Sequence, residues 1–155
     1  MGETFACIVR AMITARHIDL VQDSFAQILP IAEQAASVFY ERLFEMAPDT
    51  RALFREDMRE QGRKLFQTLA LVVDALHRID DVLPVARSLA VRHVGYGVDE
   101  CHYEAVGKAL IETLRHELGE GFNEDVEGAW ALAYGLLSQH MIDAARGGVQ
   151  SKVAA

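Results

Sequence analysis

Histidine offers this chain its widest chemical use, because an imidazole can bind a metal ion or transfer a proton near neutral pH. The six histidines stand at positions 17, 77, 93, 102, 116 and 140. His77 and Asp81 have the i, i+4 spacing of a metal-binding pair, but nothing in the sequence supplies the remaining ligands. His93 differs from the others because it lies near the predicted end of a helix, before the glycine-containing turn 95–97 and ten residues ahead of Tyr103.

The elements that must position these residues are helices. Apolar residues recur at helical spacing along nearly the whole chain, and the alternation typical of a strand is almost absent. Capping residues, prolines and glycines divide the pattern, with Thr14 and Asn123 as N-caps. The predicted helical stretches are 14–29, 30–46, 49–54, 57–79, 84–95, 100–118 and 123–147, the last one ending at Gly147–Gly148. The sequence therefore predicts an all-α domain of six to eight helices.

Length and composition suit one well-cored domain. The chain has 155 residues, of which 51% are hydrophobic and 25% are charged. We expect an N-terminal leader at residues 1–13, the domain at 14–147 and a C-terminal tail at 148–155. Met12 could also be an internal start, which leaves the preceding residues dispensable.

Charge and cysteine content exclude several classes of protein. A net charge of -8 argues against binding to nucleic acid or to an anionic membrane surface, which need a surplus of Lys and Arg. No segment approaches the roughly 20 apolar residues of a membrane span, and the N-terminus lacks a signal-peptide pattern. Cys7 and Cys101 are too few for a disulfide scaffold and lack metal-site spacing. We therefore expect a cytoplasmic protein with reduced thiols.

The segment SLAVRHVGYGVDECHYEAVGKAL contains a histidine, a turn and then the pattern His-Tyr-x-x-Val-Gly. In this it resembles the globin family, in particular bacterial single-domain globins and the globin halves of flavohaemoglobins. The resemblance implies the globin fold, packed three-over-three around a haem b, with His93 as the proximal iron ligand. It gives His102 no haem role. Tyr103 would either help to orient His93 or form part of the core.

The segment FYERLFEMAPDTRALFREDMREQGRKLF resembles the distal side of the same family. The resemblance places Tyr40 at the distal tyrosine, Phe54 at the phenylalanine that packs on the haem, and Gln61 at the distal polar position. Leu65, one turn later, takes the apolar distal position. A phenol and an amide above the iron would donate hydrogen bonds to dioxygen, which carbon monoxide accepts poorly. We therefore expect tight oxygen binding.

The last predicted helix, in GFNEDVEGAWALAYGLLSQHMIDAA, also resembles the family but departs from it at one position. Ala145 stands where flavohaemoglobins have a glutamate that activates the proximal histidine. Asp143 is two residues away, which turns it by about 200° around the helix onto another face. A strongly electron-donating proximal side is therefore not expected. Further predicted haem contacts are Val98 and Val106 at the haem edge and Arg92 or Lys64 near a propionate.

The resemblance implies a protein that reversibly binds dioxygen and also nitric oxide and carbon monoxide, for oxygen storage or transport. One alternative is a nitric oxide dioxygenase, which would need an external reductase because we expect no reductase domain before the chain ends at Ala155. A gas sensor or a haem-free interaction module is another. Both a monomer and a homodimer remain open.

Overall fold

The computed structural model describes residues 11–54 and 57–154, with only the backbone described from 148 onward. Within this part the chain is helical and contains no strand, as the sequence predicts. The α-helices are α2 (Ala15–Ile28), α3 (Ala32–Met46), α4 (Met58–Asp74), α5 (Ile79–Gly95), α6 (Glu100–Leu118) and α7 (Glu124–Ala154). The short 3-10 helices are η1 (Leu29–Ile31), η2 (Pro48–Leu53) and η3 (Gly119–Gly121).

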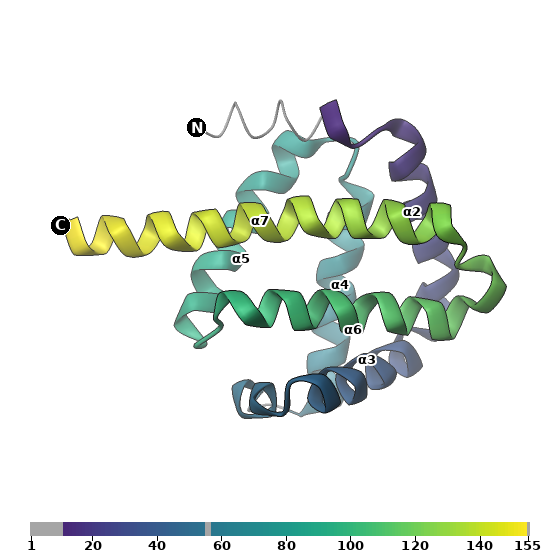
Figure 1. Ribbon diagram of the computed structural model, residues 1–155, viewed down its shortest axis with the longest axis horizontal. Coiled ribbons are helices and arrows are strands. Elements are labelled where there is room, and N and C mark those ends of the chain that lie inside the picture. Colours follow the sequence, from purple (N-terminus) through teal and green to yellow (C-terminus); the bar gives the residue numbers. More distant parts are fainter. Residues whose placement is uncertain (1–10, 55–56, 155) are drawn as a thin grey trace.

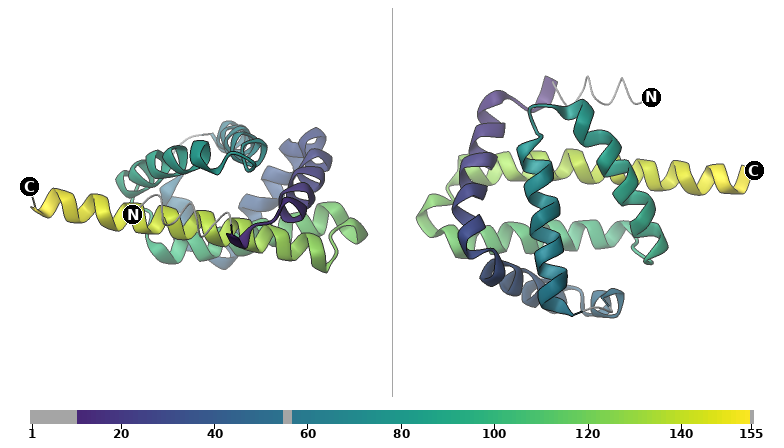
Figure 2. Two further views of the ribbon diagram at one scale, coloured as in Figure 1. Left: turned by 90° about the horizontal axis from the view of Figure 1, so that it is seen from above. Right: turned by 180° about the vertical axis from the view of Figure 1, so that it is seen from behind.

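The helices form two crossed layers. Helices α6 and α7 run side by side, and α2, α4 and α5 cross behind them (Figure 1). The view from behind shows the same three helices in front of α6 and α7, with α3 along the lower edge (Figure 2). The most extensive contacts join α5 to α7, α3 to α6, α3 to α4 and α2 to α7. Helix α3 packs on α6 and completes that layer, so the result is the expected packing of three helices over three.

Side-chain caps fix the starts of several helices. Thr14 and His17 form a reciprocal capping box at the start of α2, with the His17 amide donating to Thr14 Oγ1 at 3.2 Å. Asn123 Oδ1 accepts from the Val126 amide at 3.0 Å and caps α7. These two caps confirm the predicted starts, because a short polar side chain satisfies amides that a helix end leaves free.

Three predicted boundaries are wrong. The single helix expected at 57–79 ends at Asp74, and the next helix begins at Ile79 rather than at Pro84. Apolar spacing could not show this turn, since Leu76, Ile79 and Val82 continue the pattern across it and all three are buried. Pro84 lies inside α5, where its missing N–H costs one helical hydrogen bond. Helix α7 continues to Ala154, since Gly147 does not take the left-handed conformation that ends a helix.

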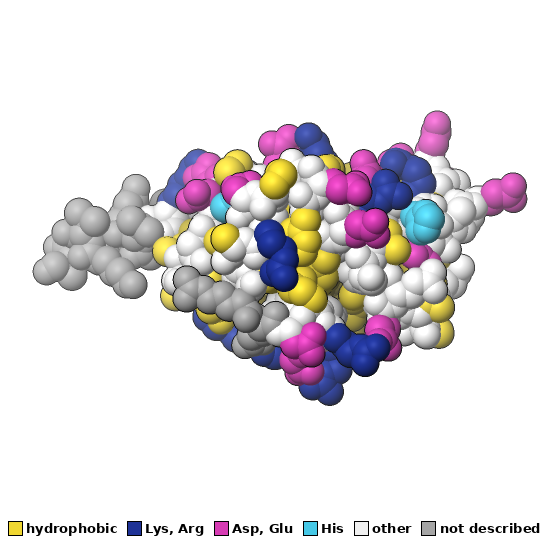
Figure 3. All heavy atoms as spheres, turned by 90° about the horizontal axis from the view of Figure 1, so that it is seen from below, with side chains coloured by type: hydrophobic (Ala, Val, Ile, Leu, Met, Phe, Trp, Pro, Cys, Tyr) yellow, Lys and Arg dark blue, Asp and Glu magenta, His cyan; other side chains and the backbone are white. Residues whose placement is uncertain are grey.

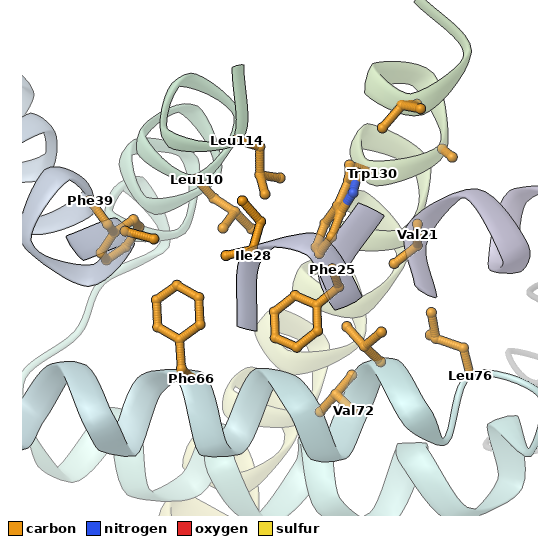
Figure 4. Close-up of a cluster of buried hydrophobic side chains, with 14 of the residues drawn as sticks. Val21, Phe25, Ile28, Phe39, Phe66, Val72, Leu76, Leu110, Leu114 and Trp130 are labelled. Carbon is orange, nitrogen blue, oxygen red and sulfur yellow. The ribbon is translucent and has the colours of Figure 1, made fainter. Parts of the chain in front are cut away.

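The main core lies where α2, α3, α4, α6 and α7 meet (Figure 4). The Phe25 ring is 6.1 Å from both Phe66 and Trp130, and the Trp130 indole donates to Ser24 Oγ at 2.8 Å. Ile13 also packs in this core with 8% exposure, although the sequence assigns it to the leader; residues 1–10 of that leader lie outside the described residues. None of the described helices has the length and hydrophobicity that a membrane span requires.

Candidate functional site

An aromatic cluster forms where α3 meets the end of η2. Tyr40 and Phe44 lie one turn apart on α3, with ring centroids 5.9 Å apart. Phe54, the C-cap residue of η2, meets the edge of Tyr40 at 5.3 Å and lies 5.8 Å from Phe44. The structure thus brings Tyr40 and Phe54 together. Phe44 was not predicted as a site residue, although its i+4 spacing from Tyr40 places both on one helix face.

Gln61 reaches the same cluster from α4. Its side chain forms a hydrogen bond with the Tyr40 hydroxyl, which lowers the pKa of the phenol slightly. Burial has the larger, opposite effect and raises the pKa of Tyr40 to about 12. The phenol is therefore neutral at pH 7 and keeps its proton for donation. Gly62 permits this approach, because a Cβ there would lie 2.8 Å from Ala36 Cβ where α3 and α4 cross.

The other predicted distal residues follow on α4. Leu65 is half-buried and packs against the main core, one turn beyond Gln61. Lys64, the predicted propionate partner, is exposed on the same helix. A groove of about 940 Å³ runs along α3 and α4 and is lined in part by Tyr40 and Phe44. His93 does not line this groove, so the site is defined by contacts between residues rather than by this groove.

His93 lies in the last turn of α5, where the chain turns toward α6. Its carbonyl accepts hydrogen bonds from the amides of Tyr96 at 3.1 Å and Val98 at 3.0 Å. Burial lowers the pKa of the half-buried ring, and the neighbouring Arg92 charge lowers it further. The Leu89 carbonyl, one turn earlier, raises the pKa of His93 by a smaller amount. Nδ1 of His93 is buried and does not form a hydrogen bond of full geometry. His93 is therefore neutral at pH 7.

Tyr103 stacks on His93. The two ring centroids are 6.2 Å apart and the planes differ by 20°. The hydroxyl of Tyr134, on α7, donates to the Tyr103 carbonyl at 2.5 Å and so fixes the backbone that carries the stacked ring. Gly107 makes room for Tyr134, since a Cβ there would lie 2.7 Å from Tyr134 Cε2. Neither supporting residue was predicted, although Gly107 belongs to the His-Tyr-x-x-Val-Gly pattern.

The remaining predicted residues surround this turn. Val98 and Val106 are half-buried, and Val106 packs against the main core. Arg92 is exposed. Asp143 is exposed and accepts a hydrogen bond from Gln139 at 2.9 Å, and no described carboxylate contributes to the pKa of His93.

His102 links the two halves of the site. Its Nδ1 accepts from the Asp99 amide at 2.9 Å, and its Nε2 lies 3.1 Å from a carboxylate oxygen of Asp49 in η2. Asp99, Cys101 and His102 hold possible metal-ligating atoms within 4.8 Å of one another. Both nitrogens of His102 are already engaged, so this group is a helix cap and a hydrogen bond to Asp49.

His77 has a similarly structural environment. It lies 4.0 Å from Asp19, while Asp81 pairs with Arg78 at 3.2 Å. His77 and Asp81 therefore each lie beside another side chain rather than facing one another.

A haem fits the chemistry of these residues. A neutral, half-buried histidine whose Nδ1 lacks a full hydrogen bond is suited to bind iron through its other nitrogen. The predicted apolar contacts Leu65, Val98, Tyr103 and Val106 are half-buried, so each keeps apolar surface for a further apolar group. Hydrophobic side chains also line the floor of a central hollow on the face seen from below, beside basic and acidic side chains (Figure 3).

Comparison with known proteins agrees with this geometry. Residues 37–141 match the family model named Globin. The chain is 38% identical over 122 residues to the flavohemoprotein of Chromobacterium violaceum, covering 74% of this chain and 30% of that protein. It is 29% identical over 139 residues to the flavohemoprotein of Vibrio cholerae, covering 85% and 34%. The chain thus spans about a third of the length of the curated relatives it matches.

A solved structure shares the fold. The crystal structure of a hexacoordinated heme protein from an anhydrobiotic tardigrade superimposes with a TM-score of 0.79 at 19% identity, covering 87% of this chain and 96% of that one. This likeness shows the all-α fold, and the family match covers the segment that carries Tyr40, Phe54, Gln61 and His93. The chain belongs to the globin family.

Proposed function

We propose that this chain binds haem b through His93 and reversibly binds dioxygen beside Tyr40 and Gln61. The observation that carries the proposal is that the fold contains both a neutral histidine on α5 and a phenol on α3 that is hydrogen-bonded to an amide on α4. When bound, a haem held by His93 would supply an iron able to bind a diatomic gas. Haem-binding is also in keeping with the flavohemoprotein relatives.

On the proximal side, the residues keep His93 neutral and oriented. A histidine must be unprotonated to act as a ligand, and burial together with Arg92 favours that form. The Leu89 carbonyl is the acceptor available to Nδ1, which would leave Nε2 as the ligating nitrogen. The Tyr103 ring packs on one face of the imidazole and restricts its rotation.

On the distal side, Tyr40 and Gln61 supply hydrogen-bond donors for dioxygen. The phenol is buried and neutral, and Gln61 holds its hydroxyl in place before any ligand arrives. Such hydrogen bonds contribute a net ~1–3 kcal/mol, which corresponds to about 5- to 150-fold slower escape of dioxygen. Carbon monoxide accepts these bonds poorly, so the pocket would favour dioxygen over it.

The test is the visible spectrum of the purified protein in its ferric, reduced and carbon monoxide-treated forms. We expect an intense Soret band that shifts on reduction and shifts again with carbon monoxide. His93→Ala should abolish this behaviour. His116→Ala is the matched control, since His116 is an exposed histidine in the last turn of α6. A wild-type protein that stays colourless with added haemin would refute the proposal and favour a haem-free interaction module.

Nitric oxide dioxygenation is the second candidate, favoured by the similarity to flavohemoproteins. In this case the protein would convert nitric oxide and dioxygen to nitrate and would need an electron-donor reductase to turn over again. Many nitrate molecules per haem in the presence of a reductant would support it. One nitrate per haem, followed by a stable ferric protein, would support oxygen storage or transport instead.

Three further expectations belong to this proposal. A cytoplasmic location would provide the reductant and would keep the exposed thiol of Cys101 reduced. Sedimentation of the haem-loaded protein would distinguish a monomer from a homodimer. Gas sensing would require a signalling response to ligand binding, which reporter assays with and without dioxygen would detect.

A further inference from the structure

Arg51 connects three elements around the aromatic cluster, although its side chain is exposed. Its Nη1 atom donates to the Phe54 carbonyl at 3.2 Å and lies 4.0 Å from the sulfur of Met58, the first residue of α4. The guanidinium carbon stands 5.4 Å from the centre of the Phe44 ring on α3, in cation–π geometry. One side chain of η2 thus contacts α3, the end of η2 and the start of α4.

These contacts fix the two rings that pack against Tyr40. Phe44 and Phe54 lie 5.9 Å and 5.3 Å from the Tyr40 ring. The Phe54 amide also donates to the Arg51 carbonyl at 3.2 Å, so backbone and side chain of Arg51 hold both polar groups of the Phe54 main chain. The amide bond closes the last turn of η2, whereas the bond to the Phe54 carbonyl comes from the Arg51 side chain and would be lost on its replacement.

A guanidinium suits this position better than an ammonium. Its flat face can stack on Phe44 while an N–H at its edge points to the Phe54 carbonyl, and a lysine cannot do both at once. No described carboxylate forms an ion pair with Arg51, so among the described residues its charge serves the ring and the carbonyl.

We propose that Arg51 is a positioning residue for the gas pocket: it holds Phe44 and Phe54 against Tyr40 and thereby slows the escape of dioxygen. The inference rests on the proposed function, since it concerns the same pocket. Arg51 acts through the two rings, which limit the motion of the Tyr40 hydroxyl and its hydrogen bond with Gln61.

The test compares Arg51→Lys and Arg51→Ala with the wild type, in two measurements. In stopped-flow kinetics of the haem-loaded variants, dioxygen should dissociate about three- to tenfold faster than from the wild type. The reason is that each variant lacks the guanidinium, which makes both the cation–π contact with Phe44 and the hydrogen bond to the Phe54 carbonyl. Carbon monoxide dissociation should change less than about twofold, since that ligand gains little from Tyr40. In the haem-free proteins, the nuclear Overhauser effect between Phe54 and Tyr40 ring protons should weaken.

Arg16→Ala is the matched control. Arg16 is an exposed arginine in the first turn of α2 that pairs with exposed Asp125 at 3.2 Å, on a different helix from the cluster. It should leave both measurements unchanged.

Three results would overturn the inference. The first is an Arg51→Ala variant whose dioxygen dissociation rate and ring contacts equal those of the wild type. The second is an Arg51→Lys variant whose dioxygen dissociation rate equals that of the wild type. The third is equal acceleration of dioxygen and carbon monoxide, which would mean general loosening. If Arg51→Ala fails to fold, Arg51→Lys decides alone. Failure of the wild type to take up haem would refute the proposed function, while the haem-free measurement would still decide whether Arg51 positions the rings.

Discussion

Gly107→Ala should destabilise the protein, although alanine normally favours a helix. The new Cβ would lie 2.7 Å from Cε2 and 3.1 Å from Cδ2 of Tyr134, both closer than carbon atoms pack. Overpacking of this kind costs about 1–3 kcal/mol. Displacing the Tyr134 ring also strains its 2.5 Å hydrogen bond to Tyr103, which contributes about 1 kcal/mol. The gain in helix propensity is about 1 kcal/mol, so the net loss is ~1–3 kcal/mol.

Urea unfolding of the haem-free protein, followed by far-UV circular dichroism, measures this loss. Gly128→Ala and Gly135→Ala are the controls, because both glycines lie within α7 and a Cβ there meets nothing within 4 Å. These controls should gain about 0.5–1 kcal/mol. The clash should also be relieved by a smaller partner, so Gly107→Ala combined with Tyr134→Leu should cost less than the sum of the single changes. A stabilised Gly107→Ala would refute this account of the His-Tyr-x-x-Val-Gly pattern.

The remaining predictions concern the two ligand sides and the link between them. Tyr40→Phe should speed dioxygen dissociation about 5- to 150-fold in stopped-flow kinetics, and an unchanged rate would exclude Tyr40 as a donor. Folding lowers the pKa of His93, so below about pH 6.5 the unfolded chain binds more protons than the folded one. The free energy of unfolding should therefore fall as the pH drops through about 6.5, and it should level off below the pKa of His93 in the folded protein. Urea midpoints at pH 7.5 and 5.5 should therefore differ more for the wild type than for His93→Gln; equal differences would contradict the lowered pKa. His102→Ala should cost about 1–2 kcal/mol, because it removes the acceptor for the Asp99 amide and the partner of Asp49. Thermal unfolding checks this cost, and a wild-type melting temperature would show that the link is dispensable.

The sequence predicts local features of this fold better than tertiary ones. The caps at Thr14 and Asn123 are local, because each side chain bonds an amide three residues away. The turn after Asp74 has no such signal, since buried residues continue at helical spacing on both sides of it. Pro84 misled the prediction for a related reason: its effect on a helix is local, but burial of Ile79 and Val82 against the core favours extending α5 in front of it.

The same distinction applies to the site. A family pattern points to His93, Tyr40 and Gln61 because each is recognised by its type and interval, and the structure then brings the last two into contact. The residues that support them are not visible in this way. Tyr134 bonds a carbonyl 31 positions earlier, and the use of Arg51 depends on how η2 turns toward α4. Such contacts arise from helix packing, which periodicity does not specify.

The two sides of the pocket differ in how they are held, and η2 joins them. Aromatic packing positions Tyr40, whereas a partly buried hydrogen bond from Tyr134 holds the backbone of Tyr103, whose ring stacks on His93. Segment η2 ends at Leu53 with Phe54 as its C-cap, and it is tied to the start of α6 by the pair between Asp49 and His102. A shift of the turn that follows His93 must therefore either move η2, and with it the Phe54 ring, or break this pair. His102 is buried and both its nitrogens are bonded, so under the proposed function this pair would couple Phe54 on one side of the haem to His93 on the other through a single short helix.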